Sequence, residues 1–305
     1  MAKLTDEQFS AYLAGAKEKL SAELPIAAEK KINYGYQYTV KLAEAKLTLN
    51  IYNGKKGLNI VYSGDSALAE RAAALLEGRR AQAAAPATFV TDGLWAGSDE
   101  SGKGDFFGSL VVAAVVVDSS TADKLRAAGV KDCKLLTDKK ILELEDIIKA
   151  SVVDYSVLEL KPRVYNLRYE QVAAQGGKLN QLLGYGHVAA LSKVLEKHED
   201  CHSALIDQFT TSMVNIRALK QRFPQCDVRQ QPKAESNLAV AAASVLARAQ
   251  FLHTMAALAA EAGVQELPKG GGAQATACAR ELAAKYGKEA LRNYVKLHFA
   301  NYQRV

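Results

Sequence analysis

The chain has 305 residues, of which 49% are apolar and 24% charged, with a formal net charge of +6 and an isoelectric point of about 8.9. This length suggests two domains, or one domain with an appendage. The composition is that of a soluble globular protein, and no apolar stretch reaches the roughly 20 residues that cross a bilayer, so no membrane partner is expected. The mildly basic charge permits a polyanionic partner such as a nucleic acid without requiring one.

The four cysteines are scattered along the chain and form no CxxC pair. This pattern indicates reduced thiols and excludes a disulfide framework or a zinc site. The start of the chain, "MAKLTDEQFSAYL", is amphipathic and lacks the uninterrupted apolar core of a secretion signal. We therefore expect a cytoplasmic protein.

Residues 1–85 are predicted to form a small domain with a helix, a short meander of strands and a second helix. Thr5 and Gln8 have the spacing of a capping box, ahead of apolar residues that share one helical face. Residues 47–51 alternate apolar and polar side chains, which is the period of a half-buried strand. Residues 53–57, "NGKKG", predict a hairpin turn, and the helical pattern "DSALAERAAALLEGRR" follows. The next stretch, "AQAAAPAT", is small, uncharged and broken by a proline, which is typical of a linker.

Residues 86–305 are predicted to form a second domain in which strands and helices alternate. The strand-like runs are "GLWAGSD", "GSLVVAAVVVD", "SVVDYSVLEL" and "SALIDQF". The helical patterns between them include "LTDKKILELEDIIKAS" and "LNQLLGYGHVAALSKVLEKH". This order of elements indicates an α/β or α+β layered fold.

Acidic side chains stand where predicted strands end and a helix begins. Asp99 and Glu100 follow "LWAGS", Asp207 follows "ALI", and Glu235 lies beside Ser236, a candidate cap of an alanine-rich helix. Because strand ends can converge on one edge of a sheet, these carboxylates are expected to share a site. Clustered carboxylates are costly unless a proton or a cation neutralises them, and oxygen-only ligands suit magnesium or manganese. Two such ions about 4 Å apart support phosphodiester cleavage.

Each feature also has a structural interpretation. Asp207 alone is typical of a solvated turn residue, and Glu235 of an acid that complements a helix dipole. "GKG" alone is a common turn. The combination of adjacent Asp-Glu, "GKG" and an unusually apolar strand is more specific. His187 on an apolar helix and Trp95 are predicted to be packing residues, and His298 in "KLHF" has no predicted role.

The stretch "GSDESGKGDFFGSLVVAAV" resembles the first motif of the type 2 ribonucleases H, and most of all the pattern of bacterial ribonuclease HIII. The resemblance continues in the family's order through "VKDCKLLTDKKI", "YN", "KLNQLLGYGHVAAL", "ALIDQF", "KAESNLAVAAASVLAR", "LPKGGG" and "VKLHFANY". It implies a ribonuclease H-like mixed sheet flanked by helices. It also implies that residues 1–85 form a small α+β domain resembling half of a TATA-box-binding fold, which holds the hybrid duplex.

Carried over residue by residue, the resemblance implies four metal-binding and catalytic acids: Asp99, Glu100, Asp207 and Glu235. Glutamate at the last position agrees with the ribonuclease HIII branch, since ribonuclease HII usually has aspartate there. The segment that approaches the ribose 2′-hydroxyls corresponds to Ser101, Gly102, Lys103 and Gly104.

Glycine suits this loop because it lets backbone groups come close to the ribose, whose 2′-hydroxyl distinguishes RNA from DNA. A side chain at Gly104 is therefore expected to obstruct the ribose and to strain the backbone. Lys134 is expected to contact a phosphate. Cys133 stands where the family usually has serine, and a thiol is a weaker hydrogen-bond donor.

The resemblance implies a monomeric endonuclease that hydrolyses the RNA strand of RNA/DNA hybrids with two Mg2+ or Mn2+ ions, leaving 5′-phosphate and 3′-hydroxyl ends. Two alternatives stay open. Ribonuclease HII-like incision at single ribonucleotides is disfavoured because "LPKGGG" occupies the region where that enzyme carries a junction-reading tyrosine. A non-catalytic hybrid-binding module is disfavoured because a pure binder gains nothing from four acids that repel phosphates.

Overall fold

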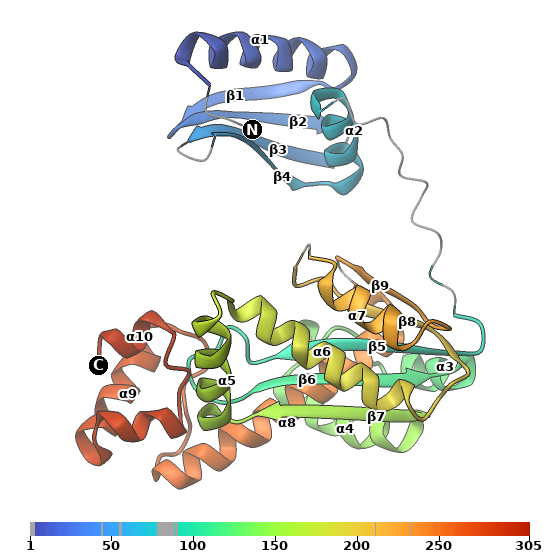
Figure 1. The fold of residues 1–305 in the computed structure, drawn as a ribbon, viewed down its shortest axis with the longest axis vertical. Helices are drawn as coiled ribbons and strands as arrows, with labels where there is room; N and C mark the ends of the chain where they lie inside the picture. Colours follow the sequence, from blue (N-terminus) through green and yellow to red (C-terminus); the bar gives the residue numbers. More distant parts are fainter. Residues whose placement is uncertain are drawn as a thin grey trace. The chain divides into compact units, whose positions relative to one another are not determined.

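The computed structural model describes residues 4–43, 45–54, 57–77, 89, 91–210, 212–232 and 234–305. The chain divides into two compact units, residues 1–88 and 89–305, drawn in Figure 1. The predicted linker and the predicted boundary after residue 85 lie outside the described residues. The same holds for Lys55 and Lys56 of the predicted hairpin turn.

The N-terminal unit is a four-stranded antiparallel sheet, in the order β1-β2-β3-β4, with two helices packed on one face. Its elements are α1 (Asp6–Glu23), β1 (Ile26–Ile32), β2 (Gly35–Leu42), β3 (Ala45–Gly54), β4 (Gly57–Gly64) and α2 (Ser66–Glu77).

The predicted capping box at the start of α1 is confirmed. The Thr5 hydroxyl accepts the N–H of Gln8 at 3.2 Å, and the Gln8 side chain accepts the N–H of Thr5 at 3.0 Å. The predicted alternation in residues 47–51 is also confirmed, because its three apolar side chains in β3 are fully buried. Strand β1 was not predicted, because its mostly exposed sequence, "IAAEKKI", has no apolar-polar alternation.

The second unit is built around a five-stranded mixed sheet in the order β7-β6-β5-β8-β9. Its strands are β5 (Leu94–Ser101), β6 (Leu110–Val117), β7 (Asp154–Leu160), β8 (Cys201–Asp207) and β9 (Asp227–Gln231). The pairs β5–β6 and β6–β7 are antiparallel, whereas β5–β8 and β8–β9 are parallel. Every residue of β6 is buried, as expected for a strand covered on both faces. Strand β9 was not predicted, because "DVRQQ" has a single apolar residue.

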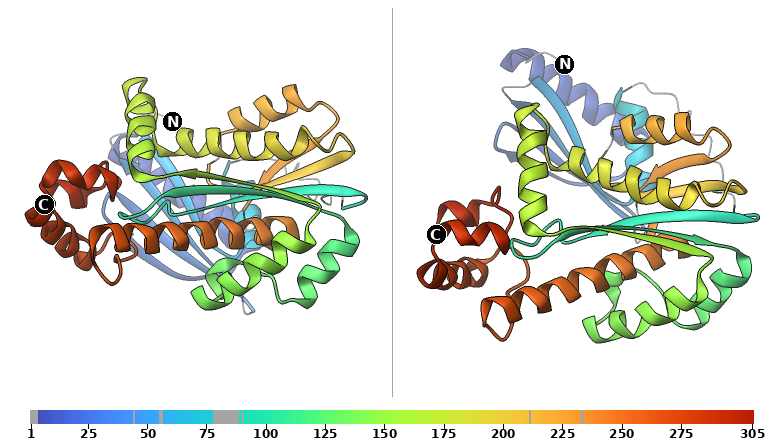
Figure 2. Two further views of the ribbon diagram at one scale, coloured as in Figure 1. Left: turned by 90° about the horizontal axis from the view of Figure 1, so that it is seen from below. Right: turned by 60° about the horizontal axis from the view of Figure 1, so that its bottom comes forward.

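Helices cover both faces of this sheet, with α6 and α7 on one face and α3, α4 and α8 on the other (Figure 2). Further short helices, α5, α9 and α10, gather with the C-terminal segment beyond one end of the sheet (Figure 1). The helices are α3 (Ser119–Ala127), α4 (Asp138–Ser151), α5 (Pro162–Ala174), α6 (Leu179–Leu195), α7 (Val214–Arg222), α8 (Leu238–Ala262), α9 (Ala273–Tyr286) and α10 (Ala300–Gln303), with 3-10 turns η1 (Cys133–Leu135), η2 (Ala234–Ser236) and η3 (Lys288–Asn293). The predicted ribonuclease H-like mixed sheet flanked by helices is confirmed.

Helix α8 is the central core helix of this unit. It is long and apolar enough to cross a membrane by length and composition alone, but 72% of its most apolar window is buried inside the unit. Its N-cap is Asn237, whose side-chain oxygen accepts the N–H of Ala239 at 3.0 Å. The predicted cap at Ser236 is therefore wrong, because Ser236 ends the 3-10 turn η2 that precedes the helix.

Helix α8 lies unusually close to β5 at Gly97. A Cβ atom on Gly97 would lie 2.2 Å from the backbone nitrogen of Val240, so only glycine fits there without moving the helix. This contact sets how closely α8 packs against the middle of β5.

Gly97→Ala is expected to destabilise the second unit by about 1–3 kcal/mol or more, because the added methyl group forces α8 away from the sheet. Gly104→Ala is the matched control, since a Cβ there meets nothing within 4 Å. Urea unfolding followed by circular dichroism measures both variants. Equal stabilities would contradict the close packing of α8 on Gly97.

Candidate active site

The predicted acids meet at the C-terminal ends of two neighbouring parallel strands. Asp99 and Glu100 lie near the end of β5, and Asp207 is the last residue of β8, which pairs with β5. One oxygen of Asp207 accepts the backbone N–H of Ala234 at 3.1 Å. This hydrogen bond brings η2, and with it Glu235, to the same edge of the sheet.

A cavity of about 470 Å³ opens over these acids. Its walls include three of the four acids and the whole predicted ribose-contacting loop. They are formed by Asp99, Glu100, Ser101, Gly102, Lys103, Gly104, Cys133, Lys134, Leu136, Asp138, Asp207 and Arg248. Glu235 does not line the cavity, but its charge acts on both Asp207 and Lys134.

Asp99 is in an environment that disfavours its charge. Its side chain is buried, and this burial together with the charges of Glu100 and Asp207 holds the pKa of Asp99 well above its usual value. The Glu100 N–H, 2.7 Å from an Asp99 oxygen, and Lys134 act in the opposite direction. Burial also raises the pKa of Asp207, and Glu235 and Glu100 add to the rise. A proton or a cation would relieve this repulsion.

Glu100 differs from its neighbour because it has partners that favour its charge. Burial alone would raise the pKa of Glu100, but contacts with His187 and Lys103 lower it. His187 Nε2 lies 3.2 Å from Glu100 Oε2, and Lys103 Nζ lies 3.5 Å from Oε1. The prediction that His187 serves only for packing is wrong, because both of its ring nitrogens contact polar side chains.

The donor chemistry of the site fits a hard divalent cation. Within the described ranges, no three His, Cys, Asp or Glu side chains converge into a ready-made metal cluster. The side chains that meet at the cavity nevertheless offer carboxylate oxygens, the ligands that Mg2+ and Mn2+ prefer. The raised pKa of Asp99 and Asp207 reflects a local excess of negative charge that a cation would neutralise.

The loop after β5 requires glycine at one of its two predicted positions. Gly102 has a φ of 83°, and a Cβ on it would lie 2.1 Å from the carbonyl oxygen of Ser109. Gly104 has no positive φ, and a Cβ there would meet nothing within 4 Å. The expectation that a side chain strains the backbone at Gly104 is therefore wrong, and the strain falls on Gly102 instead.

The C-terminal segment holds the residues that follow this loop. Lys296 is fully buried, and its ammonium group donates to the carbonyl oxygens of Asp105, Phe107 and Gly108 at 2.9, 3.3 and 2.7 Å. Burial lowers the pKa of Lys296 to about 7. The Asp105 carboxylate accepts the N–H of Gly270, in "LPKGGG", at 2.6 Å. Residues that follow the predicted ribose-contacting loop are thus held by two distant segments.

Two further motifs lock the C-terminal segment to α5. The Asn166 side chain donates to the carbonyl oxygen of Val295 at 2.9 Å. His298 stacks on Tyr169, with ring centroids 4.4 Å apart, and its Nδ1 lies 3.3 Å from the Tyr165 hydroxyl. Burial lowers the pKa of His298 to about 4, so the ring is neutral near pH 7. His298, which had no predicted role, therefore acts as an anchor of this segment.

Positive side chains line the cavity beside the acids. Lys134 is largely exposed, and although partial burial lowers its pKa, the surrounding carboxylates raise it on balance. Arg248, which the sequence did not single out, also lines the cavity and donates to Asp138 at 3.0 Å. Burial raises the pKa of the Cys133 thiol to about 11, so Cys133 is neutral there. Lys134 thus lies where it can meet a phosphate, whereas Cys133 supplies no charge.

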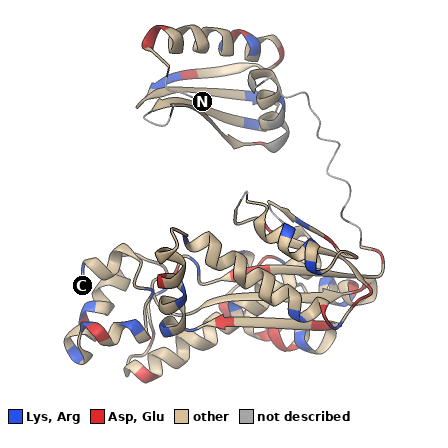
Figure 3. Cartoon of the chain, in the orientation of Figure 1, with Lys and Arg blue, Asp and Glu red and all other residues tan. Residues whose placement is uncertain are grey.

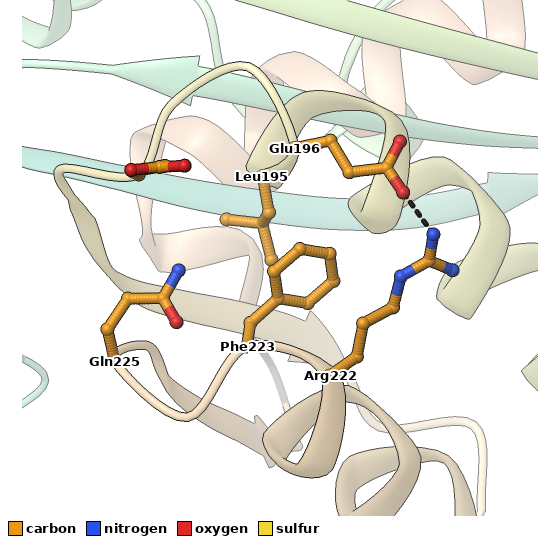
Figure 4. Close-up of a pocket in the computed structure, with 6 residues that line it drawn as sticks. Leu195, Glu196, Arg222, Phe223 and Gln225 are labelled. Carbon is orange, nitrogen blue, oxygen red and sulfur yellow. Dashed lines mark hydrogen bonds and ion pairs between the residues drawn. The ribbon is translucent and has the colours of Figure 1, made fainter.

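A second hollow, of about 620 Å³, lies at the opposite end of the sheet (Figure 4). It is lined by Leu195, Glu196, Glu199, Arg222, Phe223 and Gln225, which precede strands β8 and β9 in the chain. Arg222 there forms an ion pair with Glu196. Ligands of open α/β sheets bind at the carboxyl ends of the strands, so the cavity over the acids is the better candidate.

Comparisons with known proteins match the part of the chain that carries these residues. A family model described as ribonuclease HII matches residues 96–302. Ribonuclease HIII of Protochlamydia amoebophila (strain UWE25) is 38% identical over 203 residues, which are 67% of this chain and 65% of that protein. Ribonuclease HIII of Bacillus mycoides (strain KBAB4) is 42% identical over 214 residues, which are 68% of this chain and 67% of that protein. The matches therefore span about two thirds of these relatives.

Solved structures extend the similarity to nearly the whole chain. The crystal structure of Bst-RNase HIII in complex with Mn2+ is 30% identical, with a TM-score of 0.64, and the match covers 94% of each chain. The structure of Aquifex aeolicus RNase H3 is 24% identical, with a TM-score of 0.55, and the match covers 97% of this chain and 98% of that one. At this lower identity the likeness concerns the fold alone.

Paired substitutions in the glycine loop separate backbone strain from contact with RNA. Gly102→Val is expected to lower the melting temperature, because it introduces both a clash with Ser109 and an unfavourable φ. Gly104→Val is expected to leave the melting temperature unchanged but to slow single-turnover cleavage of an RNA/DNA hybrid by about tenfold or more, if its side chain keeps the ribose from the backbone. Full cleavage by a well-folded Gly104→Val protein would mean that the loop does not meet the ribose.

Proposed function

Since the chain belongs to the ribonuclease HII family, in its ribonuclease HIII branch, we propose that it is an endonuclease that hydrolyses the RNA strand of RNA/DNA hybrids. The observation that carries this proposal is the meeting of Asp99, Glu100 and Asp207 in one cavity with the glycine loop and Lys134. Acids that repel phosphates, placed beside groups that can bind them, suit cleavage better than binding alone.

Asp99, Glu100, Asp207 and Glu235 would hold the divalent cations, Mg2+ or Mn2+ and two per site. When bound, such ions activate water for attack on phosphorus and neutralise the charge that develops on the leaving oxygen. Attack of water on phosphorus with cleavage of the bond to the 3′ oxygen would leave a 5′-phosphate on one product and a 3′-hydroxyl on the other.

The chain's own residues supply orientation and recognition. Gly102 and Gly104 let backbone groups of the loop approach the 2′-hydroxyls, the feature by which a protein distinguishes RNA from DNA. Lys134, exposed at the cavity wall, would bind a backbone phosphate and place the scissile bond over the acids. Because Lys296 holds the segment that follows the loop, the loop would lose little conformational freedom when the duplex binds.

Ribonuclease HII-like incision at single ribonucleotides is the second candidate function. The region "LPKGGG" offers no tyrosine that could read an RNA–DNA junction, and its Gly270 is engaged with Asp105 and Phe106. We therefore expect cleavage within uniform RNA/DNA hybrids, with much weaker incision of a DNA duplex that holds one ribonucleotide. Assays of the purified protein on both substrates, with Mg2+ and with Mn2+, decide between the two functions.

The N-terminal unit is proposed to hold the hybrid duplex. Residues 1–88 contain 12 Lys and Arg against 9 Asp and Glu, and Figure 3 shows the basic residues on α1 and on the strands. A surplus of positive charge favours phosphate contacts that are independent of sequence. A monomeric state and a cytoplasmic location remain predictions.

Asp99→Asn is expected to reduce hybrid cleavage by more than about 100-fold, because it removes a cation-binding oxygen from the site. Binding of the hybrid should be unchanged or tighter, since one negative charge that repels phosphates is lost. The melting temperature should not fall, because burial of the ionised Asp99 disfavours the folded state. Asp123→Asn, an exposed acid outside the cavity, is the control. An Asp99→Asn protein with near wild-type turnover would overturn the metal-site assignment.

Removal of residues 1–85 is expected to raise the KM for a hybrid by about tenfold or more while lowering kcat far less. A remote phosphate-binding surface stabilises substrate and transition state equally, so its loss appears in KM. Steady-state kinetics of the full-length and truncated proteins measure the two constants, and circular dichroism checks that the remaining unit is folded. An unchanged KM would require another purpose for the N-terminal unit.

A further inference from the structure

His187 joins two side chains of β5 that lie on the same face of the sheet. Because side chains alternate along a strand, Ser98 and Glu100 both point toward α6. His187 Nδ1 lies 2.7 Å from the Ser98 hydroxyl oxygen, and Nε2 lies 3.2 Å from Glu100 Oε2. His187 and Ser98 are both fully buried, so water does not compete for these contacts.

The hydrogen-bond partners define which nitrogen carries the proton. An ionised carboxylate has no proton to donate, so the Glu100 oxygen that lies 3.2 Å from Nε2 accepts a hydrogen bond. Nε2 therefore donates to Glu100, and Nδ1 lies within hydrogen-bond distance of the Ser98 hydroxyl, which can donate or accept. The contacts from Ser98 through His187 to Glu100 thus give both ring nitrogens a side-chain partner.

Packing fixes the position of the His187 ring. The adjacent Gly186 lets α6 approach the sheet, since a Cβ there would lie 2.8 Å from a methyl group of Val112. The ring stacks on Phe209, with centroids 4.8 Å apart and planes 7° apart. Phe209 follows Asp207 by two residues, so the same ring touches the segment that carries a second acid.

We propose that His187 is a positioning residue for Glu100. The contact with Nε2 holds Oε2, so that Oε1 is the oxygen left for a cation at the cavity that Glu100 and Lys103 both line. Any buried histidine needs a hydrogen-bond partner, and here the partner of Nε2 is a proposed metal-binding acid. This inference rests on the proposed function, because it takes Glu100 to be a cation ligand.

Two substitutions of nearly equal chemistry test the contact. His187→Gln places an amide nitrogen at about the reach of Nε2, and His187→Asn places one near Nδ1, too far from Glu100. Partners that orient a ligating group typically contribute about 10–100-fold in metal affinity. Titration calorimetry of the full-length protein with Mn2+, without nucleic acid, is therefore expected to show an affinity about 10–100-fold weaker in His187→Asn and within about threefold of wild type in His187→Gln.

Controls separate positioning from general damage. His253→Asn removes a histidine that lies 2.7 Å from Glu145 outside the cavity, and it should bind Mn2+ as the wild type does. Melting temperatures show whether each variant folds. Should His187→Asn not fold, Ser98→Ala supplies the second measurement. It removes the hydroxyl that contacts Nδ1, so the His187 ring is held less firmly against Glu100. Weaker Mn2+ binding by a folded Ser98→Ala protein supports the proposal, and wild-type affinity contradicts it.

Asp99→Asn, measured in the same way, distinguishes the two possible failures. If Asp99→Asn loses Mn2+ binding while His187→Asn binds as tightly as wild type, or more tightly, the positioning role of His187 is wrong and the metal site stands. If Asp99→Asn also binds Mn2+ normally, the proposed metal site itself is wrong, and the role of His187 falls with it.

Discussion

The site depends on the burial of two adjacent carboxylates at the end of one strand. Side chains alternate across a strand, so Asp99 and Glu100 enter different surroundings although they are neighbours. Asp99 lies on the side of α8 and η1, where its charge acts on Cys133, and its pKa is raised. Glu100 lies on the side of α6, where His187 and Lys103 lower its pKa. Asp99 therefore favours binding of a proton or a cation, whereas the contacts of Glu100 favour its carboxylate form.

The rest of the second unit keeps these acids in place. The fully buried strand β6 and the long helix α8 form a rigid support, and Gly97 lets α8 lie directly against β5. In addition, the buried Lys296 binds three carbonyl oxygens of the segment that follows the glycine loop. A lysine ammonium has three donors, so this arrangement satisfies all of them without an acidic partner. The C-terminal motif thus supports the loop rather than the chemistry.

The sequence predicted much of this arrangement because its signals are local or carried by recognisable motifs. The capping box at Thr5, the alternation in residues 47–51 and the apolar strands around Asp99 and Asp207 each follow from short-range periodicity. Polar strands such as β9 gave no such signal. Contacts between distant segments were also missed: His187 reads as a core residue on an apolar helix, and its bond to Glu100 spans 87 positions.

The glycine loop is a second case in which the sequence could not predict the role of each residue. The motif indicated that both Gly102 and Gly104 matter, but it could not say why. Only the three-dimensional approach of Ser109 to Gly102 separates a glycine required by the backbone from one with open space around it. Function and local geometry therefore impose different demands on two residues of one motif.

If the acids at the ends of β5 and β8 bind the divalent cations of a nuclease, crystals soaked in Mn2+ will hold manganese between them. Anomalous diffraction at the manganese absorption edge locates the ions. We expect manganese peaks bounded by Asp99, Glu100, Asp207 and Glu235. Peaks elsewhere on the protein, with none between these acids in crystals whose protein still cleaves a hybrid, would contradict it.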